Sequence, residues 1–267
     1  MKKYSGDWYW YYAINSVLVI LILFPIYWTF ISSVKKPDEL ITSEPTFYPH
    51  TWTWQYYDRI WNYDTAVLNS ATTATNNSSK KIHKTTGSVT QTIGIDDAFT
   101  NSAIVSVGTI IFSIIVSTFA GYGLTFFRIP FKEVLFILLI TPILVPAISL
   151  IIPIYKLLKG LGLTDSYLGL IFLHTTAMLP IGIFMMRNAF SSIPNSLREV
   201  ALLEGTSELR IIGNVMLPLA IPGLLTVMVF AMYTSWNDYV LAFLFINSPE
   251  KTMLNIALAK IALGGSQ

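Results

Sequence analysis

The residues of this chain whose types and spacing could do chemistry are gathered in residues 199–222, which read EVALLEGTSELRIIGNVMLPLAIP. This stretch is polar and lies between two long apolar runs. Pro194 suits the first position of a helix, and Gly205 suits a left-handed helix stop. Thr206 and Ser207 can then cap a second short helix. The pattern predicts a bent helix pair at a membrane surface, whose chemistry would be the docking of another protein.

The first of these two helices has an amphipathic face. Leu197, Val200, Ala201 and Glu204 lie three or four residues apart, so they share one side of the helix. Such a face suits insertion into a groove on a soluble partner. The alternative is an ordinary amphipathic connecting loop.

The same segment resembles a known motif. Glu199, Ala201, Gly205 and Leu217-Pro218 look like the EAA loop, E-A-A-x(3)-G-x(9)-I-x-L-P, of permease subunits in binding-protein-dependent ATP-binding-cassette (ABC) importers. Val200 and Val215 replace the family's Ala and Ile, and Glu204 stands where Asp is usual. The resemblance implies that an ATPase subunit docks here, with its contacts among Leu197, Glu199, Val200, Ala201, Leu203, Glu204, Gly205, Leu217 and Pro218.

Two ionisable residues lie within or beside apolar runs, namely His174 and Asp238. Asp238 follows Pro218 by about twenty residues, which places it near the outer interface at about 1.5 Å per residue. There it could belong to an aromatic belt with Trp236 and Tyr239, or it could line a translocation pathway. The string SWND resembles the S-W-N-[DE]-[FY] passage of sugar-importer permeases. The candidate substrate pathway comprises Tyr122, His174, Asn237 and Asp238.

Catalytic and metal-binding patterns are missing from the sequence. It has no G-x-x-x-x-G-K-[ST] phosphate loop, no G-x-S-x-G and no H-E-x-x-H. With zero cysteines and only the scattered His50, His83 and His174, it offers neither a thiolate nor a metal-ligand spacing. The net charge of +2 is spread over helix ends, unlike the clustered patch that nucleic acid needs. We therefore expect no catalytic residue, no metal and no cofactor on this chain.

The composition indicates an integral membrane protein. Apolar residues make up 53% of the chain and charged residues only 12%, with a mean hydropathy of +0.57. The first apolar run is too long and too aromatic for a cleaved signal peptide, so it is expected to be a retained helix. Five runs are long enough to cross about 30 Å of hydrocarbon. They are residues 11–34, 101–127, 134–158, 166–187 and 218–246.

Basic residues in short loops predict the orientation. One side carries more of them, and that side is expected to be the cytoplasm, together with the N-terminus and residues 199–217. Its basic residues are Lys2, Lys3, Arg128, Lys132, Arg187, Arg198 and Arg210, against Lys156, Lys159, Lys251 and Lys260 on the other side.

Three regions are expected along the chain. Residues 1–34 hold the first helix, residues 35–100 an outer loop, and residues 101–267 the permease core with its cytoplasmic loop at 194–217 and outer loop at 247–267. Residues 35–61 resemble the passage that follows the first helix in carbohydrate-importer permeases. Residues 62–97 lose apolar periodicity and are predicted to be an irregular polar insertion. Its Asn76 and Asn77 each begin a glycosylation sequon.

Small residues and prolines shape the predicted core. Ser113, Ser117 and Gly121 recur four apart and allow a second helix to approach closely. Prolines in the third and fourth runs, which kink helices, fit a pore-lining bundle better than a simple anchor. They are Pro142, Pro146, Pro153 and Pro180.

Residues 247–267 are predicted to contain a short helix and not a sixth span. Met253, Ile256 and Lys260 recur at helical spacing, and Gly264-Gly265 offers a stop. In maltose-type permeases the region resembles a loop that reaches into the docked binding protein, so Met253, Ile256, Ala259 and Lys260 are candidate contacts. A surface helix covering the bundle is the alternative. A sixth helix of the family would follow residue 267.

Taken together, the chain resembles the second, shorter permease of maltose-type sugar importers. The resemblance implies an all-α polytopic bundle of the type I importer class, in the cell membrane. It also implies a homologous second permease, two ATPase subunits that hold ATP and Mg²⁺, and an external sugar-binding protein. An ion-coupled secondary transporter would need midplane ion sites and repeat symmetry. An intramembrane enzyme would need a nucleophile, base or metal constellation. Neither set of features is evident in the sequence.

Overall fold

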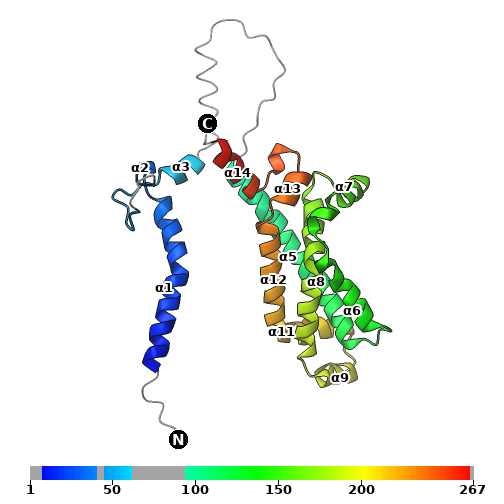
Figure 1. Ribbon diagram of the computed structural model, residues 1–267. Helices are drawn as coiled ribbons and strands as arrows, with labels where there is room; N and C mark the ends of the chain where they lie inside the picture. The colour runs from blue at the N-terminus through cyan, green and yellow to red at the C-terminus, as the bar shows by residue number, and fades with distance from the viewer. Residues whose placement is uncertain (1–7, 41–44, 62–93, 265–267) are drawn as a thin grey trace. The chain divides into compact units, whose positions relative to one another are not determined.

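The computed structural model describes residues 8–40, 45–61 and 94–264, and every regular element in those ranges is helical. The chain divides into two units, residues 1–82 and residues 83–267, which we describe separately. The first unit holds α1 (Trp8–Ser33), α2 (Pro37–Leu40) and α3 (Gln55–Trp61). The second unit holds α5 (Ile95–Phe126), α6 (Lys132–Ile140), α7 (Ile151–Gly160), α8 (Tyr167–Ser191), α9 (Asn195–Leu203), α10 (Glu208–Ile211), α11 (Leu217–Leu219), α12 (Ile221–Trp236), α13 (Val240–Phe245) and α14 (Leu254–Gly264) (Figure 1).

In the first unit, the chain after α1 folds back onto the end of that helix. The Tyr27 hydroxyl donates to the Phe47 carbonyl at 2.7 Å. Lys35 is buried, donates to the Thr46 carbonyl and lies over the Trp28 ring at 5.1 Å. At 26 residues, α1 is about 39 Å long, which is enough to cross a bilayer.

The second unit is built on α5, α8 and α12, which pack against one another. The most extensive packing is between α5 and α8, where Ser113 and Ser117 are fully buried. A Cβ atom at Gly121 would lie 2.7 Å from the Cβ of Met186, so the glycine is what lets the helices meet. The predicted small-residue stripe on residues 113–121 is confirmed as a helix-packing surface.

Two of the five predicted spans are broken. Residues 134–158 form α6 and α7 with a bend of 93°, and residues 218–246 are divided by a bend of 84° before α12 and by a further break before α13. The physical reason is proline, which lacks a backbone donor: Pro146 lies between two 3₁₀ turns, and Pro222 lies in the first turn of α12. Three helices in the described ranges are long enough to span a membrane, and five if each bent pair is one span.

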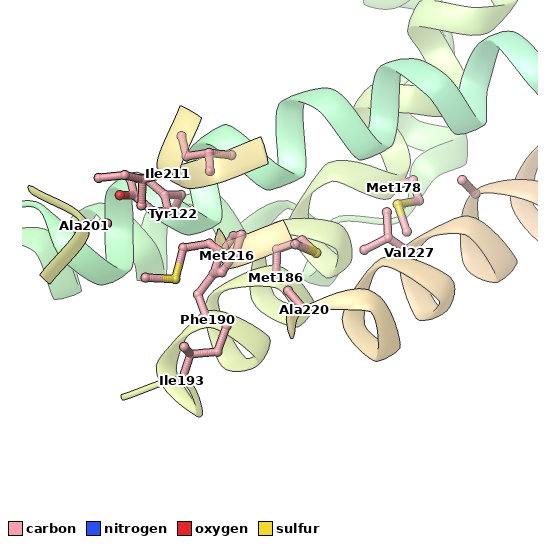
Figure 2. Close-up of a cluster of buried hydrophobic side chains, with 12 residues drawn as sticks. Tyr122, Met178, Met186, Phe190, Ile193, Ala201, Ile211, Met216, Ala220 and Val227 are labelled. Carbon is pink, nitrogen blue, oxygen red and sulfur yellow. The ribbon is translucent and has the colours of Figure 1, made fainter. Parts of the chain in front are cut away.

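Two hydrophobic clusters stabilise opposite parts of the bundle. One surrounds Tyr122 near the end of α5 and includes Phe190 and Met216 (Figure 2). The other surrounds Val105 near the start of α5 and includes Phe245. Each cluster underlies one of the two polar sites described below.

The polar insertion is largely outside the described residues, as are the sequons at Asn76 and Asn77. The insertion was predicted to be irregular as far as residue 97, and that boundary is wrong, since α5 begins at Ile95. Asp96 and Asp97 in the first turn of α5 favour this start, because negatively charged carboxylates are stabilised by the positive end of the helix dipole.

Candidate functional site

The loop between α8 and α12, residues 192–220, is termed here the coupling loop. Pro194 is the N-cap of α9, one residue before the predicted position. Gly205 has φ +78°, which confirms the predicted left-handed stop. Its amide donates to the Leu202 carbonyl at 3.0 Å, and the Thr206 amide donates to the Ala201 carbonyl at 3.1 Å. A Cβ at Gly205 would meet no atom within 4 Å, so the backbone alone requires glycine.

The second half of the coupling loop is only partly regular helix. α10 is four residues long and continues as a π-helical turn, Ile212–Met216, into α11. Ser207 is the N-cap of α10, but its side chain makes no capping hydrogen bond. The predicted second helix is present as this short α10. Its first residue, Glu208, is fixed by contacts of its side chain with Tyr122 and Arg198.

α9 presents two different faces. Leu203 is 88% exposed, and Val200 and Leu197 are also exposed. Ala201 is buried against the cluster around Tyr122, so it faces the bundle (Figure 2). Of the four residues predicted to share a docking face on α9, the structure leaves Leu197, Val200 and Glu204 exposed and turns Ala201 inward. Leu203, a predicted ATPase contact, is exposed as well.

Three polar side chains link the coupling loop to α5. Tyr122 on α5 donates its hydroxyl hydrogen to Glu208 on α10. Arg198 on α9 donates from Nε to the Tyr122 hydroxyl at 3.0 Å and forms an ion pair with Glu208. Burial lowers the pKa of the Arg198 guanidinium, but hydrogen bonds to Glu208 and Tyr122 outweigh that effect and raise its pKa. Arg198 is therefore charged at every physiological pH, and the three elements are held together.

This placement separates Tyr122 from the other candidate pathway residues. His174 on α8 and Asp238 between α12 and α13 do lie together, with Nε2 and Oδ2 3.4 Å apart. Asn237, in contrast, donates to the Tyr233 carbonyl of its own helix and is exposed. The four predicted residues therefore do not form one site in this structure.

The His174–Asp238 pair is enclosed in the bundle. The side chain of His174 is 2% exposed and that of Asp238 is 13% exposed. Asp238 also accepts hydrogen bonds from the amides of Leu241 and Ala242, so it caps α13. The adjoining cavity, lined also by Ser102 and Ser235, has a volume of about 10 Å³. That is about enough for one water molecule and far too small for a sugar.

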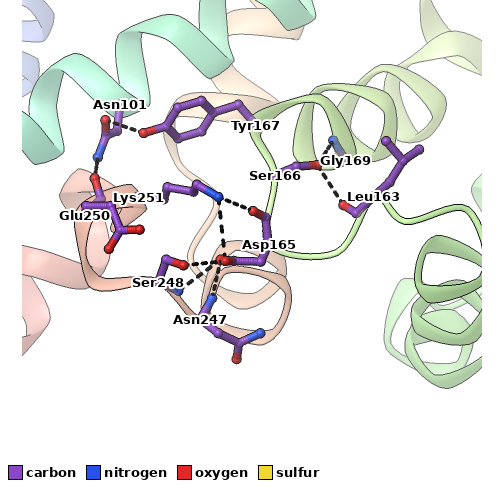
Figure 3. Close-up of polar contacts among 10 residues, drawn as sticks. All are labelled: Asn101, Leu163, Asp165, Ser166, Tyr167, Gly169, Asn247, Ser248, Glu250 and Lys251. Carbon is purple, nitrogen blue, oxygen red and sulfur yellow. Dashed lines mark hydrogen bonds and ion pairs between the residues drawn. The ribbon is translucent and has the colours of Figure 1, made fainter.

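A second polar site anchors residues 247–253, the first part of the predicted loop at 247–267; from here on the name outer loop means these seven residues alone. Asp165 has a left-handed backbone, φ 55°, and its Oδ1 accepts from the Asn247 and Ser248 amides, both at 2.9 Å (Figure 3). Its other oxygen accepts from the Ser248 hydroxyl and lies 3.6 Å from the Lys251 ammonium. Burial raises the pKa of Asp165, but the hydrogen bonds from Ser248 and Asn247, with Lys251, outweigh it and lower the pKa to about 2.

The start of α5 holds the other side of the outer loop. Asn101 donates from Nδ2 to the carbonyls of Glu250 and Thr252, at 2.9 and 3.0 Å. Its Oδ1 accepts from the Tyr167 hydroxyl at 2.7 Å (Figure 3). Ser102 accepts from the Leu254 amide at 2.9 Å, at the first residue of α14. α14 is thus fixed to α5 at its beginning.

Two of the candidate binding-protein contacts on α14 and the residue before it are buried. Met253 and Ile256 are each 5% exposed and belong to the cluster around Val105. The expectation that they contact a partner is corrected, since their side chains pack in the bundle. Ala259 is half-buried and Lys260 is exposed, so these two remain available.

Several site residues escaped the sequence reading. The sequence identifies Arg198 and Lys251 only as basic loop residues, and nothing in it pairs them with Glu208 and Asp165. Asp165 has a left-handed backbone two residues before α8, and Asp adopts that conformation more often than most residue types, which is a signal that the sequence offers. No group of three metal-ligating side chains occurs in the described part of the chain.

Comparisons with known proteins agree with these features. A sequence profile of the family described as "Binding-protein-dependent transport system inner membrane component" matches residues 113–264. The chain is 27% identical to the inner membrane ABC transporter permease protein YcjP of Escherichia coli (strain K12). That alignment runs over 248 residues and covers 93% of this chain and 79% of that protein.

It is also 26% identical over 254 residues to the diacetylchitobiose uptake system permease protein NgcG of Streptomyces coelicolor, covering 94% of this chain and 74% of that protein. Among solved structures, a chain in the crystal structure of a bacterial ABC transporter involved in the import of the acidic polysaccharide alginate has a TM-score of 0.72 at 23% identity, over 100% of this chain and 88% of that one. The fold is shared with that structure.

Proposed function

The chain belongs to the family of binding-protein-dependent transport system inner membrane components, and we propose that it is a permease subunit of an ABC importer that carries a sugar into the cytoplasm. It is a multi-pass membrane protein. Energy for transport comes from ATP and Mg²⁺ held by partner ATPase subunits, so catalysis belongs to those partners.

The observation that carries the proposal is the coupling loop. α9 exposes Leu197, Val200 and Leu203 beside a rigid left-handed stop at Gly205. An exposed row of apolar side chains on a short helix fits a groove on a soluble partner. Next to this exposed row, Ala201 packs into the bundle, so a partner that moves α9 also moves the helices beneath it.

The orientation follows from this assignment. With the coupling loop in the cytoplasm, the N-terminus is cytoplasmic as well, and the outer loop and α14 face the outside of the cell. There, Ala259 and Lys260 are positioned to contact an external binding protein. A homologous second permease subunit completes the pathway, because a single bundle of this size encloses no cavity near His174 and Asp238 large enough for a sugar.

A sugar is favoured as the substrate by the names of related proteins. NgcG is named for diacetylchitobiose uptake, and another relative, AglG of Rhizobium meliloti (strain 1021), is an alpha-glucoside transport system permease protein at 29% identity over 166 residues. In this proposal the bundle switches between two packings when the ATPase dimer closes, and the pathway opens alternately to each side.

The proposal is tested by purification and reconstitution. The tagged chain is purified from its own membranes in mild detergent, and the eluate is assayed for ATP hydrolysis. We expect an ATPase and a second permease to co-elute, and the reconstituted complex to take up a labelled sugar only with ATP and the binding protein. Uptake driven by a proton or sodium gradient without ATP would contradict the proposal.

A further inference from the structure

α5 is attached to a functional loop at each of its ends. Near its end, Tyr122 is 1% exposed and bonded to Arg198 and Glu208 of the coupling loop. Near its start, Asn101 is 7% exposed and bonded to two carbonyls of the outer loop. The two attachment points are 21 residues apart on one helix, which is about 32 Å at 1.5 Å per residue.

The helix between these points is suited to transmit displacement. α5 runs without a break from Ile95 to Phe126 and contains no proline. It also packs along both α8 and α12. The chain turns by 93° where it enters α7 and by 84° where it enters α12. A displacement along either of those paths would be absorbed at the bend.

The hydrogen bonds at both attachment points are strong and are shielded from water. The Tyr122 hydroxyl lies between a cation and an anion, and charge-assisted hydrogen bonds are about twice as strong as neutral ones. Asn101 uses both its donor and its acceptor, with Tyr167 fixing its orientation. Each side chain is buried, so water cannot readily replace the partner it loses.

We propose that Tyr122 and Asn101 are positioning residues, and that α5 links them into one rigid connection between the coupling loop and the outer loop. The inference rests on the proposed function, because it supposes that an ATPase moves the coupling loop. It adds that ATP binding on one side of the membrane is read out at α14 on the other, through this helix.

The test uses the whole complex in lipid nanodiscs with Mg·ATP as the probe. Because the chain has no cysteine, Ala259→Cys introduces one site on α14 for an environment-sensitive dye. The complex without that cysteine, labelled in the same way, gives the signal from partner subunits. We expect the dye to respond to ATP, and Tyr122→Phe to raise the ATP concentration for the half-maximal response about tenfold, as loss of one hydrogen bond to a charged group implies. Asn101→Asp, which removes the donor at nearly constant shape, is expected to do the same.

The double variant, Tyr122→Phe with Asn101→Asp, distinguishes transmission through α5 from two independent local effects. Substitutions that lie about 32 Å apart and share no partner normally have additive effects. If both act through α5, the double variant is no worse than either single variant, at about tenfold; independent local effects would give about a hundredfold and overturn the inference. Tyr155→Phe on α7 and Asn188→Asp on α8 make the same chemical changes at exposed positions, and both should respond like the parent.

The outcomes also distinguish this inference from the proposed function. A parent complex that hydrolyses ATP but gives no dye response overturns the inference alone, as does a Tyr122→Phe response equal to the parent's. A chain that associates with no ATPase overturns the proposed function. If Tyr122→Phe fails to assemble, Glu208→Gln with Asn101→Asp carries the same test, and additivity of that pair counts against the inference.

Discussion

Replacement of Gly205 should uncouple ATP hydrolysis from uptake in proportion to backbone strain. The residue has φ +78°, and a Cβ there would meet no atom of this chain within 4 Å. Steric clashes within this chain therefore add nothing to the free-energy cost of a substitution. A left-handed backbone costs an L-residue about 1–2 kcal/mol. If the backbone instead leaves that conformation, the amide bonds to the Leu202 and Ala201 carbonyls are lost, at about 1 kcal/mol each.

Either route gives a penalty of about 2 kcal/mol, which is about a thirtyfold shift away from the native loop. The assay is sugar uptake per ATP hydrolysed in proteoliposomes containing the whole complex. We expect Gly205→Asn to stay near wild type, because Asn tolerates this backbone, Gly205→Ala to be impaired, and Gly205→Val to be worst.

Gly213 offers a matched control on the same loop. It too has open space around a Cβ but lacks a positive φ, so Gly213→Ala should cost little. The strain argument is refuted if Gly205→Val transports with normal coupling. It is also refuted if Asn and Val at position 205 are equally damaging, since bulk against the docked partner would then be the cause.

The remaining predictions concern the outer loop, the insertion and α14. Asp165→Asn should destabilise the outer loop by about 2 kcal/mol at pH 7, seen as a lower Tm. Because the pKa of Asp165 is lowered to about 2, its stabilisation is complete above about pH 4 and is lost as the pH falls toward 2, so the Tm difference from wild type should shrink only in that range. Deletion of residues 62–93 should leave association with the second permease intact, measured by co-purification, and loss of association would make the insertion structural. A cysteine at Ala259 should crosslink to the binding protein in an ATP-trapped complex, whereas one at the buried Ile256 should not; no crosslink from Ala259 would leave α14 as a covering helix.

The local features of the coupling loop could be predicted from sequence because glycine and proline act on their own backbone. Gly205 was assigned its left-handed conformation, and the small residues 113–121 were assigned to helix packing; both are confirmed. A kink at Pro146 was predicted but not its size, and the bend near Pro222 was not predicted, since a proline permits a bend but tertiary packing decides how far it goes.

Contacts between distant residues could not be predicted in the same way. Asp165 and Ser248 are 83 residues apart, and Tyr122 and Glu208 are 86 apart. Helical spacing grouped Met253 with Ile256 correctly but did not say which side of the helix faces the bundle, and the contact prediction for that pair was wrong. Periodicity defines a face, whereas the partner of that face is decided by the fold.

The central claim, that the coupling loop docks an ATPase subunit, is tested most directly by crosslinking from α9. Leu203 is 88% exposed and Ala201 is 8% exposed, only two residues away on the same short helix. We expect a photoreactive probe on Leu203→Cys to crosslink to the co-purifying ATPase subunit in high yield, and the same probe on Ala201→Cys to give little product. Absence of an ATPase crosslink from Leu203→Cys in a complex that still hydrolyses ATP would contradict the account.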